Sequence, residues 1–122
     1  MSDAPRVVHD VQPAVTDHTS LPAGVTWRLA EPGRQLDANV LNLSPGQTIG
    51  THTEPDLDVL VVVVAGTGCV DTPGGSVTLT AGEVLWLPRG STRGLVAGAQ
   101  GLSYLTVHRR RPGLQIASGP PG

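Results

Sequence analysis

Residues 45–66 read PGQTIGTHTEPDLDVLVVVVAG, and this stretch decides the fold that the sequence predicts. It opens with a Pro-Gly turn, continues through a polar segment, and ends in an apolar run at residues 59–65. Valine is β-branched and favours strands, so the run is predicted to be a strand. Both faces of that strand are apolar. One face is therefore expected to line a core, and the other to pack on a second sheet or another subunit.

Short strand-like segments fill most of the remaining chain. The 16 Gly and 11 Pro residues stand between apolar runs, where a turn-rich β protein needs them. No long segment has apolar residues at helical spacing, so helix is expected for no more than a turn or two. Many short, evenly spaced strands indicate an all-β sandwich or barrel. We expect strands at residues 25–29, 37–43, 59–65, 67–71, 76–80, 84–87, 92–96 and 102–108.

Residues 82–93, GEVLWLPRGSTR, form a second informative stretch. Together with residues 45–66 they resemble the two sequence motifs of the cupin family, G-x5-H-x-H-x3,4-E-x6-G and G-x5-P-x-G-x2-H. The resemblance covers residues 36–108 and implies an all-β fold, the antiparallel double-stranded β-helix or cupin jelly-roll barrel. The motif positions that match are Gly46, His52, Gly66, Gly82, Pro88 and Gly90.

The positions that hold a metal in cupins of the usual type are mostly changed here. In such cupins, three His and one Glu converge on Mn, Fe, Ni, Cu or Zn. Here the second His position is Glu54 and the last is Arg93. The glutamate position is Val59, and Asp58 lies one residue away. Residues two apart on a strand share a face, so His52 and Glu54 are expected to point into one cavity. Asp58 would need a local bulge to join them.

Two interpretations of this pocket follow. A guanidinium stays charged and has no lone pair, so Arg93 inside the cavity disfavours a cation and attracts an anion. Arg93 then either pairs with Glu54 or binds the carboxylate, phosphate or enolate of a ligand, and no cofactor is expected. The alternative is a divalent transition metal held by His52, Glu54 and Asp58. Trp86, in the second motif, is expected either to wall the pocket or to belong to the core.

Three classes of function are compatible with these residues. The favoured one is a small cupin-barrel protein that binds a small polar, anionic ligand through His52, Glu54, Arg93 and Trp86. The second is an enzyme. It would be a metal-dependent dioxygenase or isomerase using His52, Glu54 and Asp58, or a metal-free enzyme with His52 and Glu54 as acid–base groups. The third is a structural or interaction protein whose pocket has lost its function. The fold alone does not choose among them.

Length and composition limit the number of domains and the kinds of partner that are expected. The 122 residues fit one domain, with an N-terminal arm or tail at 1–20, the barrel at 21–112 and a C-terminal tail at 113–122. A net charge of −2 gives no reason to expect a nucleic-acid partner, and the single cysteine, Cys69, excludes an internal disulfide. No secretory signal is evident and no apolar run is long enough to cross a membrane, so a cytoplasmic location is expected.

A homodimer is also expected. A monomer would expose a strip of Val and Leu on the outer face of the strand at residues 59–64, and such strips promote association. The dimer would form through that face or through an exchanged N-terminal arm.

Overall fold

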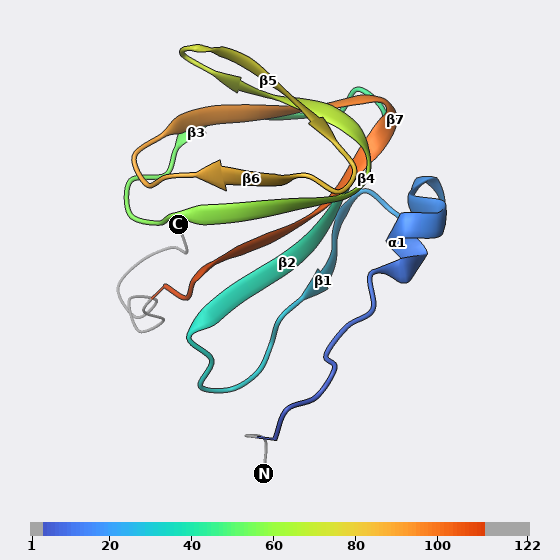
Figure 1. Cartoon of the computed structure of the whole chain (residues 1–122), viewed down its shortest axis with the longest axis vertical. Coiled ribbons are helices and arrows are strands. Elements are labelled where there is room, and N and C mark those ends of the chain that lie inside the picture. Colours follow the sequence, from blue (N-terminus) through green and yellow to red (C-terminus); the bar gives the residue numbers. More distant parts are fainter. Residues whose placement is uncertain (1–3, 112–122) are drawn as a thin grey trace.

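The computed structural model describes residues 4–111, which form antiparallel strands around one core with a short helix outside them (Figure 1). The elements are α1 (Gln12–Asp17), the 3-10 turn η1 (His18–Ser20), β1 (Gly24–Arg28), β2 (Leu36–Leu43), β3 (Thr48–Thr53), β4 (Val59–Thr72), β5 (Gly75–Thr80), β6 (Val84–Leu87) and β7 (Thr92–Arg109). Hydrogen-bonded neighbours follow the order β1-β2-β7-β4-β5, while β3 also pairs with β7 and β6 with β4. The prediction of an all-β fold with a turn or two of helix is confirmed. No helix between residues 4 and 111 is long and apolar enough to span a membrane.

The two longest strands, β4 and β7, pair with each other along most of their length. The sequence predicted two strands in each of these regions, but each strand is continuous, and the pairing only shifts register near Gly66. Gly66 has a φ of +80°, and a Cβ atom there would lie 2.2 Å from the carbonyl oxygen of Gly101. A side chain at position 66 would collide with backbone, so the motif requires glycine at this point.

The inward-facing side chains of β2 and β7 change from apolar to polar along the barrel. At one end Leu43 pairs with Leu102, and the two are only 3% and 0% exposed. We call this the closed end; its buried side chains, which do not line the cavity at the opposite end of the barrel, are Leu43, Val63, Val70, Leu79, Ala97 and Leu102. Toward the other end, the open end, the successive pairs are Leu41 with Tyr104, Asn39 with Thr106, and Asp37 with His108.

The segment before β1 packs against the outer side of the sheet. Helix α1, which the sequence analysis did not predict, buries Ala14 (4% exposed). The side-chain Nδ2 of Asn42 donates to the carbonyl oxygens of His18 (3.1 Å) and Leu21 (3.0 Å). The Nε2 of His18 lies 2.8 Å from the carbonyl oxygen of Gln100, which can only accept, so this nitrogen carries the proton. Polar contacts as well as burial therefore hold the N-terminal segment to the barrel.

Candidate functional site

The open end of the barrel contains a cavity of about 540 Å³, a size that suits a small molecule. Polar side chains from β2 and the end of β7 line one part of it, and apolar side chains from β4, β6 and the loop before β4 line another. The lining includes Asp37, Asn39, Thr106 and His108 among the polar residues, Leu57, Val59, Val61 and Leu87 among the apolar ones, and the motif residues His52, Glu54 and Arg93. The structure thus brings three of the four expected ligand-binding residues to one cavity.

An extra residue in β3 determines how His52 reaches the cavity. Ile49 pairs with Leu95 on β7. His52 pairs with Arg93, so three steps along β3 match two steps along β7. This mismatch is a bulge. It lets Ile49 and His52 line the same cavity, although their odd spacing would place them on opposite faces of a regular strand. The sequence analysis named no strand at β3, and a bulge has no signature in a single sequence.

The proton positions of the two cavity histidines follow from their hydrogen bonds. The Nδ1 of His52 lies 3.0 Å from the carbonyl oxygen of Gly50, so Nδ1 carries the hydrogen and Nε2 is the acceptor of the neutral ring. His108 repeats this arrangement, with its Nδ1 2.9 Å from the carbonyl oxygen of Arg109. Both imidazoles that line the cavity therefore have an acceptor nitrogen available when neutral.

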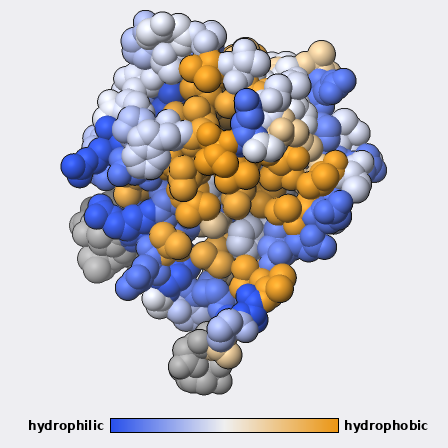
Figure 2. All heavy atoms as spheres, viewed as in Figure 1, coloured by the Kyte–Doolittle hydropathy of each residue, from blue (hydrophilic) through white to orange (hydrophobic). Residues whose placement is uncertain are grey.

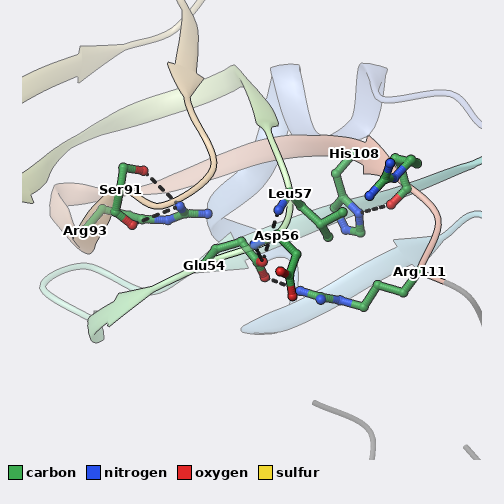
Figure 3. A network of polar contacts seen from close by, with 8 residues as sticks. Glu54, Asp56, Leu57, Ser91, Arg93, His108 and Arg111 are labelled. Atoms are coloured by element: carbon green, nitrogen blue, oxygen red, sulfur yellow. Dashed lines mark hydrogen bonds and ion pairs between the residues drawn. The ribbon is translucent and has the colours of Figure 1, made fainter. Parts of the chain in front are cut away.

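Glu54 is bound through both oxygens by the protein itself, as Figure 3 shows. Its Oε2 accepts hydrogen bonds from the backbone N–H groups of Asp56 (2.8 Å) and Leu57 (3.2 Å), and its Oε1 pairs with the Arg111 guanidinium. Burial alone would raise the pKa of Glu54, but these hydrogen bonds and the charge of Arg111 outweigh it and lower the pKa below its usual value. Glu54 is therefore ionised near neutral pH and organises the loop between β3 and β4.

Arg93 is also largely buried, but no carboxylate of the described residues forms an ion pair with it. It is only 6% exposed, and its Nη1 donates to the Oγ (3.0 Å) and the carbonyl oxygen (3.4 Å) of Ser91. Within residues 4–111, no carboxylate oxygen lies within 4.0 Å of its guanidinium, and its Nε and Nη2 have no acceptor. Burial lowers the pKa of Arg93 and the charge of Glu54 partly restores it, yet an arginine remains a cation.

Asp58 and Trp86 do not reach the cavity. The inward position at the start of β4 is occupied by Val59, as the alternation of a regular strand requires. The Oδ1 of Asp58 instead accepts a hydrogen bond from the backbone N–H of Arg89 at 2.9 Å. Trp86 is 55% exposed and lies outside the cavity, whereas its neighbour Leu87 lines it. Trp86 is thus neither a pocket wall nor a core residue.

The side chains present do not fit the metal that the resemblance implies. In the part of the chain that the structure describes, no group of three or more His, Cys, Asp or Glu side chains is placed to hold a metal ion. Both oxygens of Glu54 are engaged, Asp58 points elsewhere, and a permanent cation, Arg93, stands at the closing position of the second motif. The alternative site of His52, Glu54 and Asp58 is therefore not assembled.

Sequence reasoning missed most of the charged and polar lining. Arg34 and Asp37 form an ion pair with Nε and Nη2 both 2.9 Å from the same Oδ1. These residues come from β2 and from the segment before it, and only strand register brings them beside the motif residues. The cavity is lined by four arginines and two carboxylates, although the whole chain has a net charge of −2. They are Arg28, Arg34, Arg93 and Arg111, with Asp37 and Glu54.

No protein-family model matches the sequence, and a comparison with curated proteins gives no match. Solved structures, in contrast, resemble the fold. KdgF from Halomonas sp. has a TM-score of 0.63 at 20% identity, covering 73% of this chain and 80% of that one. The Cnp3 cupin domain of Schizosaccharomyces pombe has a TM-score of 0.62 at 13% identity, covering 79% and 71%. A Klebsiella pneumoniae protein with a double-stranded β-helix domain has a TM-score of 0.64 at 18% identity, covering 87% and 90%. The chain therefore has the cupin fold, the antiparallel double-stranded β-helix, as its two motifs predicted.

Proposed function

We propose that this protein binds a small organic anion in the cavity at the open end, and that Arg93 holds the anionic group. The observation that carries the proposal is a largely buried arginine that lines the cavity, with no carboxylate within 4.0 Å of its guanidinium among residues 4–111. Taking an ionised group out of water costs free energy unless a counter-charge compensates it. Glu54 does so only in part, because both of its oxygens are bound by other groups and it forms no ion pair with Arg93. An anionic ligand supplies the missing charge.

The other charges of the cavity support the same proposal. Four of the eight basic residues of the chain line it, and the two lining carboxylates are each paired with an arginine. An excess of positive charge in a cleft attracts anions. The open Nε and Nη2 of Arg93 are neighbouring donors, which match the two oxygens of a carboxylate or phosphate. His52, the cross-strand neighbour of Arg93, adds an acceptor for a ligand hydroxyl when neutral.

Isothermal titration calorimetry with acetate, benzoate and inorganic phosphate tests this proposal. At least one of these anions is expected to bind the unmodified protein. The substitution Arg93→Met is expected to weaken that binding about 10- to 100-fold, because a charge-assisted bidentate contact is lost. Arg89→Met is the matched control, since Arg89 is exposed and lines no part of the cavity. Equal affinity of the unmodified protein and Arg93→Met would overturn the proposal.

We also propose that the protein forms a homodimer through the outer face of β4 and β6. On this face Leu60, Val84 and Trp86 are 39%, 63% and 55% exposed, and Leu60 is the direct cross-strand neighbour of Trp86. Figure 2 shows apolar residues gathered across the middle of the molecule in this view. Exposed apolar patches of this kind mark interaction surfaces.

Light scattering at high micromolar concentration tests the dimer. The unmodified protein is expected to have the mass of a dimer, and Trp86→Arg that of a monomer. Val77→Arg is the control, because Val77 is similarly exposed (45%) but lies on β5. A monomer mass for the unmodified protein would refute this interface.

A further inference from the structure

The wall of the cavity is divided between two neighbouring strips of the sheet. On β4 and β6, Val59, Val61 and Leu87 line the cavity and are only 8%, 2% and 8% exposed. We call these three the apolar strip. On β2 and β7, Asn39 and Thr106 line the cavity and are direct cross-strand partners, which we call the polar pair. Val61 is itself paired with Thr106, so the apolar strip and the polar pair lie side by side.

The side chains of the polar pair do not stabilise the described part of the fold through hydrogen bonds. Within residues 4–111, neither the amide of Asn39 nor the hydroxyl of Thr106 makes a hydrogen bond, and neither is sealed from solvent. By contrast, Asp37 on the same strand is paired with Arg34, and Asn42 holds the N-terminal segment. Polar groups that line a cavity and have no partner in the protein are satisfied by water or by a ligand. A facing amide and hydroxyl provide both donors and acceptors, which is what one ligand hydroxyl requires.

We propose that the ligand is a hydroxylated carboxylate with one apolar face. Its carboxylate binds Arg93, its apolar face lies on the apolar strip, and its hydroxyl binds the polar pair. This inference rests on the proposed function and names the class of ligand for the same site. Arg93 belongs to the pairing of β7 with β3, and the polar pair belongs to the pairing of β7 with β2. The ligand therefore spans two strand pairs and places its hydrocarbon body between two polar contacts.

Three carboxylates that differ by one feature at a time test this inference in the full chain. Acetate has only the anionic group, cyclohexanecarboxylate adds an apolar body, and 4-hydroxycyclohexanecarboxylate, as separate cis and trans isomers, adds a hydroxyl. Each buried methylene strengthens binding about three- to fourfold, so cyclohexanecarboxylate is expected to bind at least about tenfold more tightly than acetate. One hydroxylated isomer is expected to bind more tightly still.

Isosteric variants then assign the two contacts. Thr106→Val removes the hydroxyl of the polar pair without changing its shape, and is expected to abolish the preference for the hydroxylated isomer while leaving cyclohexanecarboxylate binding intact. Val61→Thr places a hydroxyl in the apolar strip and is expected to weaken cyclohexanecarboxylate binding several-fold. Thr78→Val is the control, because Thr78 is exposed on β5 and lines no part of the cavity. Circular dichroism verifies that each variant is folded.

The outcomes separate the two proposals. If acetate and the ring acids bind with equal affinity in an Arg93-dependent way, the anion site stands and the proposed ligand class is wrong. If the preference for the hydroxylated isomer survives in Thr106→Val, the polar pair is not the hydroxyl site. If no carboxylate or phosphate binds the unmodified protein at all, the proposed function itself fails.

Discussion

The closed and open ends of the barrel are built from the same strands but from different side chains. Along β2 the inward positions run from Leu43 at the closed end to Asp37 at the open end, and β7 changes in step from Leu102 to His108. The closed end is filled by buried apolar side chains of the core, whereas the open end encloses a cavity of about 540 Å³. Between β2 and β7 the pairing runs from Leu43 with Leu102 to Asp37 with His108 without a shift of register, so the two-residue period is kept along this part of the sheet. On these two strands the cavity wall is thus created by changing the chemistry of inward positions, whereas His52 reaches the cavity through the bulge in β3.

At the open end, Glu54 and Arg93 differ in how far the protein compensates their charges. Glu54 has its charge compensated by Arg111 and by backbone N–H groups, so it stabilises the free protein. Arg93 has no such partner in the described residues. The comparison indicates which polar residues stabilise the fold and which are available for binding.

The largest expected effect comes from making the same substitution at both ends. Leu102→Ala should lower the free energy of unfolding by about 3–4 kcal/mol, because a cavity opens in a fully packed region. Leu41→Ala should cost only about 1–2 kcal/mol, since Leu41 already faces the cavity and is only partly buried. Chemical denaturation measures both values. Equal losses would mean that the open end is packed as tightly as the closed end.

Tyr104 lies where the two ends meet, and burial raises its pKa to about 12. As the single tyrosine of the chain, it can be followed by absorbance at alkaline pH. Because the folded protein favours the neutral phenol, this contribution to stability is complete below pH 10, the usual pKa, and is lost as pH rises from 10 toward 12. The shift corresponds to about 2–3 kcal/mol. Ionisation of Tyr104 near pH 10 in protein that is still folded would show that water reaches its hydroxyl group.

Glu54→Gln should lower the free energy of unfolding at neutral pH by about 1–2 kcal/mol, because the pairing with Arg111 is lost. The folded-state pKa of Glu54 lies below its usual value of 4.5, so this contribution is present above pH 4.5 and is lost as pH falls through the folded pKa. The difference between the two proteins should therefore shrink in acid. Asp56→Asn removes a charge from an exposed neighbour and serves as the control. A pH-independent difference would assign the loss to packing.

The smallest expected effect is an increase in the free energy of unfolding, whereas the preceding substitutions lower it. In a buffer without organic anions or phosphate, Arg93→Met should raise the free energy of unfolding by about 1 kcal/mol, because a buried unpaired charge is replaced by an apolar side chain. Arg89→Met should change it by less than about 0.5 kcal/mol. Denaturant titration measures both. A loss of several kcal/mol in Arg93→Met would mean that the protein itself already compensates this charge.

The sequence predicted the part of the site that lies within its two motifs. His52, Glu54 and Arg93 line one cavity, as their positions in the motifs predicted. The sequence did not predict Asn39, Thr106 or any other residue that strand register alone brings to the cavity. Register depends on bulges such as the one in β3, and a single sequence carries no signal for them.

Asp58 was a candidate metal ligand if a local bulge turned it inward, and Trp86 was expected either to wall the cavity or to belong to the core. The alternation of β4 and β6 turns both away from the cavity. The short helix α1 was missed because six residues are too few to establish a helical period.

The place of β7 in the chain determines when the cavity at the open end can form. β7 is the last strand of the described residues, yet it pairs with β2, β3 and β4. During translation those strands emerge first, and only local pairings such as β4 with β5 can form before β7 is complete. Pairing between distant segments is slow because the intervening loop must close. Because Arg93 and Thr106 both belong to β7, a nascent chain arrested before residue 92 would hold local hairpins such as β4 with β5 but would lack the residues proposed to bind the anion.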